Sequence, residues 1–309
     1  ERAVVDELIE LRPEVASHHA QSANQLLRHA KCLYESDDVQ GARDILTNHL
    51  PYIEKALKDF PQEDSLYMTT VLCYQVSART YRSAQDMETA TSELQKAIAI
   101  CEPLCEEPQA GGYIRMILAT LYMEKSTYFL QQRLLAEAAD ECEKGLVILE
   151  RLQAEEPAGE HVGQLESAYH LYGNVMNKLG RYEEYLSRSE PVRTWPRRSQ
   201  NIENARSHRL VALAGCGRLA EARAGFEQLA KNASRPQAFL NFCGLASRCA
   251  GAAKKDSGEH RFFLEQSVRF LKLAEENGVL EEAAVIELLK ENDDFAALRE
   301  SGALDEWLQ

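Results

Sequence analysis

The 309-residue sequence has few of the residues that interrupt helices, with only 16 glycines and 9 prolines. It contains no apolar run long enough to cross a bilayer as a helix and no recognisable secretory signal. Basic residues number 35 against 49 acidic ones, and the net charge of −14 disfavours binding to the phosphate backbone of nucleic acids. We therefore expect a cytoplasmic protein with no membrane span and no nucleic-acid partner.

The sequence also lacks the short signatures of common catalytic and cofactor sites. It has no GxGxxG, no HExxH, no GxSxG and no GxxxxGK followed by Ser or Thr. His18 and His19 are adjacent, so they face different sides of a helix and cannot hold one metal ion together. These absences predict a segment that is not an enzyme, with no catalytic residue, no metal and no cofactor.

Eight cysteines are present, and none belongs to a CxxC pair. Cys101 and Cys105 are four residues apart, which places them on one face of a helix and leaves a metal or redox site there as an alternative. The favoured interpretation is that all eight are small buried side chains in a reducing compartment.

The most informative feature is a repeated helix opening. Leu-Ala-Glu-Ala occurs at 135–138 and again at 219–222, and three related tetrapeptides begin at residues 39, 87 and 182. The last residue of each tetrapeptide is taken as its marker, and four of the five markers are small. The markers are Ala42, Ala90, Ala138, Tyr185 and Ala222, with steps of 48, 48, 47 and 37 residues. Each step has room for two helices and short connections.

The positions around the markers repeat as well. Twelve residues before them stand small side chains in four units, with a departure at Leu210 in the fifth; the four are Ala30, Ala78, Ser126 and Gly173. Three residues further on, all members are large and apolar: Leu33, Tyr81, Phe129, Met176 and Leu213. Gly180 and Gly217 are expected to end helices in the left-handed conformation.

This pattern resembles the tetratricopeptide repeat (TPR) family, with the best local matches at 169–184 and 213–222. The resemblance implies an all-α solenoid of about six antiparallel helix pairs, followed by short capping helices. We expect an N-terminal segment at 1–14, a repeat array at 15–280 and a C-terminal cap at 280–309. The expected units are 15–61, 62–108, 112–156, 162–196, 200–234 and 236–278. Pro51 should kink the second helix or start a new segment there, and 303–308 should form a last short helix.

Residues 270–278 and 288–298 resemble the end of the TPR tails that follow kinase domains in some bacterial serine/threonine kinases. This resemblance implies a non-catalytic module that belongs, or once belonged, to a signalling enzyme.

In TPR stacks the first helix of each pair lines a concave groove. The side chains expected to face it are basic or carry amides: Arg28, Lys31, Gln75, Arg79, Arg82, His170, Asn174, Asn177, Lys178, Asn204 and His208. Such side chains suit the carboxylates and the backbone of a peptide, so we predict an interaction scaffold that binds an acidic or extended peptide segment. The alternative is an ordinary solvated face paired with local Glu.

A second basic patch surrounds Trp195. It consists of Arg188, Arg193, Arg197, Arg198, Arg206 and Arg209. It could bind an anion, a phosphopeptide or the chain's own acidic tail, but the favoured interpretation is a basic linker anchored by Trp195.

A remaining alternative is a sensor for a small ligand or signalling peptide, which would need a deep pocket near Tyr74, Tyr122, Tyr169 and Tyr172. We favour helix packing as the role of these tyrosines. The identity of the partner and the oligomeric state are left open by the sequence.

Overall fold

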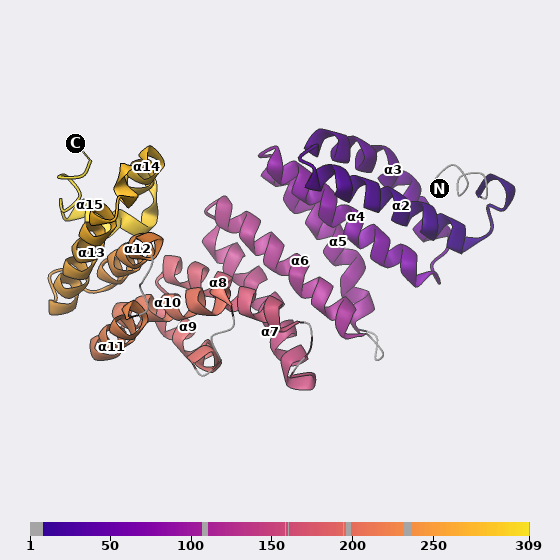
Figure 1. The fold of residues 1–309 in the computed structure, drawn as a ribbon. Helices are drawn as coiled ribbons and strands as arrows, with labels where there is room; N and C mark the ends of the chain where they lie inside the picture. Colours follow the sequence, from indigo (N-terminus) through magenta and orange to yellow (C-terminus); the bar gives the residue numbers. More distant parts are fainter. Residues whose placement is uncertain are drawn as a thin grey trace. The chain divides into compact units, whose positions relative to one another are not determined.

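The computed structural model describes residues 9–106, 111–157, 159, 161–193, 195, 199–231 and 236–308. Within these ranges the chain is helical and contains no strand, and successive helices pack as pairs (Figure 1), which confirms the predicted all-α fold. The chain divides into two compact units, of which the first ends at Ala168 and the second begins at Tyr169. No helix among the described residues is long and apolar enough to span a membrane.

The first unit is built from helices of about equal length. They are α2 (Ala16–Glu35), α3 (Val39–Asp59), α4 (Asp64–Ser83), α5 (Met87–Glu106), α6 (Gly112–Gln131) and α7 (Leu135–Glu155), and the boundary between the units falls inside α8 (Val162–Leu179). The pairs α2–α3, α4–α5 and α6–α7 are each joined by three-residue turns. A hydrophobic core of buried side chains runs from α2 to α6.

The second unit contains shorter helices. They are α9 (Tyr182–Arg188), η1 (Glu190–Arg193), α10 (Gln200–Gly215), α11 (Leu219–Ala230), α12 (Pro236–Ala252) and α13 (Gly258–Glu276). The unit ends with η2 (Val279–Glu281), α14 (Ala283–Glu291), η3 (Asp293–Phe295) and α15 (Ala296–Glu300). Phe295 and Leu298 are buried and α15 packs against α12, so this segment caps the last pair.

The five markers occupy equivalent places in the structure. All are fully buried, with an exposed fraction of 0% for Ala42, Ala90, Ala138, Tyr185 and Ala222. In α3 the marker starts a buried stripe that continues through Leu46, Leu50 and Ile53, which is the spacing of one helical face. The markers therefore lie where the two helices of a pair pack on each other.

The turn before each marker is also the same in all five pairs. The residue five positions before the marker has a positive φ: Asp37 (67°), Gln85 (63°), Arg133 (61°), Gly180 (71°) and Gly217 (73°). The next amide closes the turn by donating to a carbonyl five residues back, as Asp86 does to Tyr81 at 3.0 Å and Arg218 to Leu213 at 2.9 Å. This is the Schellman arrangement, and it confirms the left-handed caps predicted at the two glycines.

Two departures from the repeat are compensated by glycine. A Cβ at Gly173 would lie 2.7 Å from Cζ of Tyr185, so the large marker fits because its neighbour has no side chain. A Cβ at Gly225 would likewise lie 2.5 Å from Cδ2 of Leu210. At both places the glycine leaves space on one helix, and the large side chain of the neighbouring helix fills that space.

One set of polar contacts occurs twice in the first unit, with every residue of the second copy 48 positions after its equivalent in the first. Tyr74 donates a hydrogen bond to Glu54, and Tyr122 donates one to Glu102. Lys96 lies 5.4 Å from the ring centre of Tyr74, and Lys144 lies 5.5 Å from that of Tyr122. Burial and the neighbouring carboxylates raise the pKa of both tyrosines, so they remain protonated donors at neutral pH. The repeat therefore includes these tyrosine–glutamate and lysine–tyrosine contacts as well as the helix packing.

Three sequence expectations need correction. Helix α3 runs without a break through Pro51, whose side chain is exposed, so no new segment starts there. Residues 303–307 form turns instead of a last helix, after Gly302 adopts a φ of 74°. Cys32 is exposed and Cys105 and Cys216 are half-buried, so not all eight thiols lie in the core.

Candidate functional site

The first helices of three successive pairs, α8, α10 and α12, line a cleft in the second unit. It comprises a cavity of about 710 Å³ and an adjoining one of about 220 Å³, which share four lining residues. We call this the amide cleft. The side chains that define it are His170, Asn174, Asn177, Lys178, Asn204, His208, Asn241, Arg248, Asp293 and Asp294. Six of these were predicted from the sequence to face a groove, and the structure brings those six together.

Two stacked histidines form part of the wall of the amide cleft. The rings of His170 and His208 lie 5.3 Å apart at an interplanar angle of 23°. Burial, with Arg248 nearby, lowers the pKa of His170, and it lowers that of His208 well below its ordinary value. Both rings are therefore neutral at pH 7 and present one donor and one acceptor each.

Asn177 and Arg248 contribute buried polar atoms that have no hydrogen-bond partner among the described residues. The Asn177 amide nitrogen donates to the backbone oxygen of His208 at 3.0 Å, whereas its Oδ1 accepts nothing. Nε of Arg248 also lacks a hydrogen bond, and its nearest carboxylate, on Asp294, is 3.5 Å away. The amide cleft thus offers one unused acceptor and one unused donor.

The acidic cap closes one end of this cleft. Asp293 lies 3.4 Å from Nζ of Lys178, and Asp294 forms the ion pair with Arg248 described above. Arg248, Asn241 and the two aspartates were not among the predicted groove residues. Arg248 and Asn241 lie on α12, where no marker had been assigned, and the contact of the cap with α8 spans 115 residues.

Three of the predicted groove residues of the first unit contact Glu124 or its neighbour Tyr128. Gln75 and Arg79 both donate to Glu124, with Nε of Arg79 at 2.8 Å from its carboxylate. Arg82 lies 5.6 Å from the ring centre of Tyr128, whose hydroxyl donates to the same Glu124. Their charge is therefore largely matched by a local carboxylate. Arg28 is exposed and Lys31 half-buried on α2.

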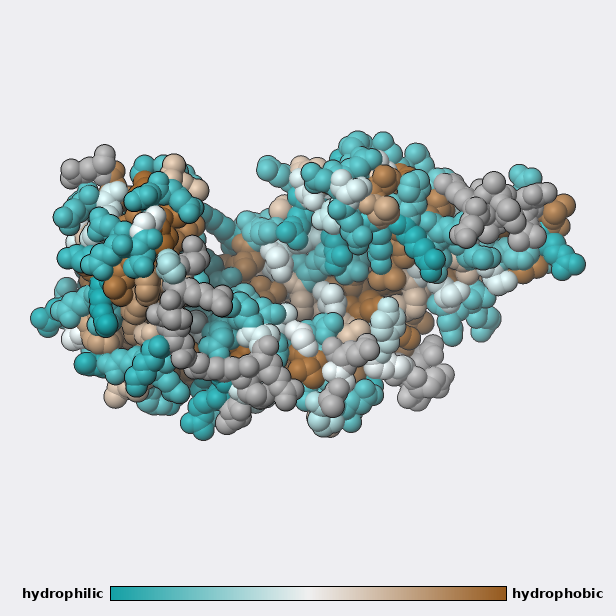
Figure 2. All heavy atoms as spheres, in the orientation of Figure 1, coloured by the Kyte–Doolittle hydropathy of each residue, from teal (hydrophilic) through white to brown (hydrophobic). Residues whose placement is uncertain are grey.

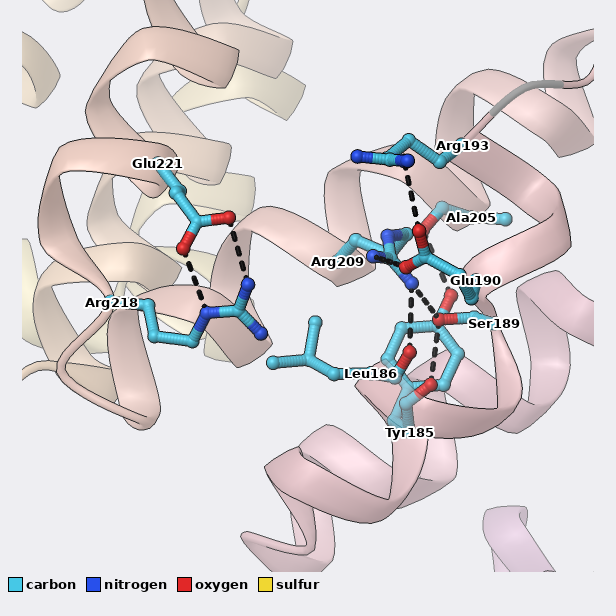
Figure 3. A network of polar contacts seen from close by, with 9 residues as sticks. All are labelled: Tyr185, Leu186, Ser189, Glu190, Arg193, Ala205, Arg209, Arg218 and Glu221. Carbon is cyan, nitrogen blue, oxygen red and sulfur yellow. Dashed lines mark hydrogen bonds and ion pairs between the residues drawn. The ribbon is translucent and has the colours of Figure 1, made fainter.

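The patch around Trp195 includes a network of ion pairs and hydrogen bonds centred on Arg209 of α10, which Figure 3 shows. The buried Arg209 donates to the backbone oxygen of Leu186 at 3.0 Å and to Oγ of Ser189 at 2.8 Å. Its remaining partner is Glu190, at 2.9 Å, which also pairs with Arg193 at 2.9 Å. Arg209 is therefore fixed in place, whereas Arg193 is exposed.

The other members of this patch are placed in part. Arg206 pairs with Glu203 at 3.2 Å and donates to the backbone oxygen of Trp195. Trp195 packs edge-on against Tyr169, with the ring centres 5.5 Å apart. Arg188 is half-buried at the end of α9, and Arg197 and Arg198 lie outside the described residues.

The four tyrosines of the sensor hypothesis are all buried. Tyr74 and Tyr122 are held by carboxylates, Tyr169 contacts Trp195, and the Tyr172 hydroxyl lies 3.4 Å from Glu184. None of the four lines the cavities described here.

The described residues contain no group of three or more His, Cys, Asp and Glu side chains that could hold a metal ion. The Cys101 thiol donates to the backbone oxygen of Ile114 at 3.8 Å. Interaction between Cys101 and Cys105 on α5 raises the pKa of Cys101 and lowers that of Cys105. The two thiols thus form a pair with no third ligand in this part of the chain.

Comparison with solved structures identifies the fold. A crystal structure from Podosopora anserina with nearly identical TPR-like repeats, described as a candidate kinesin light chain, shares 16% sequence identity with this chain. The match covers 70% of this chain and 99% of that one, with a TM-score of 0.51. The protein has a TPR-type fold.

Two further matches are more distant. BtubC (BKLC) from P. vanneervenii is 15% identical, over 89% of this chain and 88% of that one, with a TM-score of 0.42. Nro1, a hypoxic regulator of sterol synthesis and nuclear import adaptor, is 12% identical over 97% of both chains, with a TM-score of 0.48. No family model and no curated protein matches the sequence.

Proposed function

We propose that the TPR-type chain is a protein-interaction module whose amide cleft holds an extended peptide segment. The observation that carries this proposal is that two buried atoms make no hydrogen bond: Oδ1 of Asn177, and Nε of Arg248, which is only ion-paired with Asp294 at 3.5 Å. Leaving such a group without a partner costs about 1–3 kcal/mol. A peptide backbone supplies both missing partners, because it presents an N–H and a C=O at every residue except proline.

The rest of the cleft suits the same ligand. Asn174, Asn204 and Asn241 come from three different helices, and each amide can donate and accept at once. The larger cavity, of about 710 Å³, falls in the size range of clefts that enclose organic ligands. An extended segment could therefore be bound mainly through its backbone, with α8, α10 and α12 as three successive supports.

The charges favour acidic side chains at one end of the peptide. Lys178 pairs with the exposed Asp293 at 3.4 Å, and Arg248 pairs with the half-buried Asp294 at 3.5 Å. The exposed Lys178–Asp293 pair contributes only about 0–1 kcal/mol, so a carboxylate of the ligand can replace Asp293. We infer that the partner is a peptide with an acidic residue near the cap, and no phosphate or nucleic acid is required.

The test is a selection of random unstructured peptides on the immobilised chain, followed by affinity measurement by fluorescence anisotropy. The double variant Asn204→Ala/Asn241→Ala should weaken the selected peptides at least tenfold, which corresponds to about 1.4 kcal/mol. Asn24→Ala is the matched control, because Asn24 is exposed on α2 in the first unit. Equal affinity for the double variant and the control, or the selection of no peptide at all, would refute the proposal.

The kinase-tail hypothesis concerns the context of this module. In the segment that resembles the kinase tails, Phe270, Phe295 and Leu298 are buried and close the last helix pair, as a cap does in any context. The hypothesis predicts that the gene encodes a kinase catalytic domain ahead of Glu1, and sequencing the gene upstream tests it.

A further inference from the structure

The second helix of the fourth pair is unusually short. Helix α9 has 7 residues, whereas α7, the equivalent helix of the pair before it, has 21. After α9 the chain continues as η1, so this side of α10 is not covered by a full-length partner helix. A cavity of about 440 Å³ lies there between η1, α10 and α11, and we call it the arginine cavity.

The arginine cavity is lined by both apolar and charged side chains. Leu210, Leu213 and Leu229 contribute apolar side chains, and Trp195 adds an aromatic ring. The charged lining residues are Arg193, Arg206, Arg209, Arg218, Glu190 and Glu221. Arg206 and Arg209 are the more deeply placed guanidiniums, with side-chain exposures of 18% and 10%. The cavity is therefore suited to a molecule that is apolar at one end and anionic at the other.

The chain already holds an oxyanion in this cavity. The Glu190 carboxylate bridges Nε of Arg193 and Nη2 of Arg209, each at 2.9 Å (Figure 3). The Glu190 side chain is 55% exposed, so it can turn out into solvent at small cost. Arg209 cannot follow, because it is fixed to the backbone of Leu186 and to Ser189. Arg193 and Arg209 would then be left with two positive charges and no carboxylate between them.

We propose that the arginine cavity binds a phosphomonoester carried on an aromatic ring. The phosphate takes the place of the Glu190 carboxylate between Arg193 and Arg209, and the ring packs on Leu210 and Leu213. A phosphate carries about −1.5 to −2 charges at neutral pH and three acceptor oxygens, which matches two guanidiniums better than a single carboxylate does. The α10 residues of this site lie on the opposite face of the helix from those of the amide cleft, and the two cavities share Leu229. The proposal goes beyond peptide binding and does not depend on it.

The binding experiment uses phenyl phosphate as the probe in calorimetric titrations of the full chain. Phenyl phosphate should bind saturably, and inorganic phosphate, which lacks the ring, at least tenfold more weakly. Arg193→Gln should lower the affinity at least tenfold, whereas Glu190→Gln should raise it severalfold by removing the competing carboxylate. Arg223→Gln is the matched control, because Arg223 is an exposed arginine on α11 that pairs with Glu227 outside this cavity.

The source of the ligand is distinguished by a second probe, a short peptide that contains phosphotyrosine. Tighter binding of the peptide than of phenyl phosphate would identify a side chain of a partner protein, and weaker binding a free small molecule. The proposal is overturned if neither the wild-type chain nor Glu190→Gln binds phenyl phosphate saturably, or if Arg193→Gln and Arg223→Gln behave alike. The amide-cleft variant Asn204→Ala/Asn241→Ala should bind phenyl phosphate normally, so failure here is separable from failure of peptide binding.

Discussion

Replacing Gly173 by alanine tests the close approach of three helices in the second unit. A Cβ at this position would lie 2.7 Å from Cβ of His208 on α10 and 2.7 Å from Cζ of Tyr185 on α9. Carbon atoms in contact are ordinarily about 3.5–4.0 Å apart. The Tyr185 ring is buried and its hydroxyl donates to the backbone oxygen of Ala205 at 2.9 Å, so the ring cannot withdraw without losing that bond.

The magnitude follows from two opposing terms. Alanine gains about 1 kcal/mol over glycine inside a helix, and overpacking typically costs about 1–3 kcal/mol or more. With two rigid contacts at 2.7 Å the upper end applies, and we expect Gly173→Ala to lower the free energy of unfolding by about 1–2 kcal/mol. Gly163→Ala, in the same helix, meets no atom within 4 Å and should raise stability by about 0.5–1 kcal/mol.

Urea unfolding followed by tryptophan fluorescence measures this difference. Both tryptophans of the chain, Trp195 and Trp307, lie in the second unit, so their fluorescence reports on the unit that contains Gly173. Gly163 lies in the first unit, so Gly163→Ala is followed by far-UV circular dichroism, which monitors the helices of both units. The unfolding midpoint of Gly173→Ala should lie below that of the wild type, and that of Gly163→Ala above it. If the two variants are equally stable, the close packing of α8 against α9 and α10 is wrong.

Three further predictions concern buried charge, turns and pH. Lys125→Met should destabilise the first unit by about 1–3 kcal/mol in urea unfolding, because it leaves the buried carboxylate of Glu141 with the exposed Lys144 as its remaining cation. Adding Glu141→Leu should recover most of the loss, and no recovery would contradict the pairing. At the turns, both Gln85 and Gly217 have a positive φ, which favours glycine. Gln85→Gly should therefore raise the free energy of unfolding by about 1 kcal/mol and Gly217→Ala should lower it by about 1 kcal/mol, seen as a higher and a lower thermal midpoint. A shift of the same sign in both would refute the left-handed turns. Burial lowers the pKa of His208 below its unfolded value of 6.5, so the unfolded chain binds the proton first. Stability of the second unit should therefore be constant above pH 6.5 and fall as the pH drops below it, with a smaller slope in His208→Gln; an equal slope would exclude this histidine as the cause.

The fold could be predicted from the sequence because small residues recur where helices cross. The spacing of Ala42, Ala90 and Ala138 was sufficient, since each is fully buried at the packing site of a pair. Two departures, at Tyr185 and Leu210, look like defects in the sequence alone. They are resolved only by the opposing glycines, which lie on a neighbouring helix and cannot be assigned without the packing geometry.

The turns were predicted only where glycine marks them. Asp37, Gln85 and Arg133 adopt the same left-handed conformation as Gly180 and Gly217, yet nothing in their chemistry requires it. The two helices that flank each of Asp37, Gln85 and Arg133 are joined by a turn of only three residues, and this connection imposes the left-handed conformation. It costs about 1–2 kcal/mol for each residue other than glycine.

The candidate site was predictable in composition but not in extent. His170, Asn174 and His208 were identified by their offset from the markers, and they do line one cleft. The position of an arginine on its helix does not reveal which carboxylate it pairs with. Arg79, for example, pairs with Glu124, which lies 45 residues further along the chain on another helix. The contact between the cap and α8 was equally hidden, because it depends on how the last helices fold back.

Hydrogen–deuterium exchange of the full chain, with and without a selected peptide, tests the account most directly. Peptide binding should slow amide exchange in α10, in α12 and in the part of α8 after Tyr169, together with the cap around Asp293. Protection confined to helices α2–α7, or no change along these three helices at saturating peptide, would contradict the assignment of the amide cleft as the binding surface.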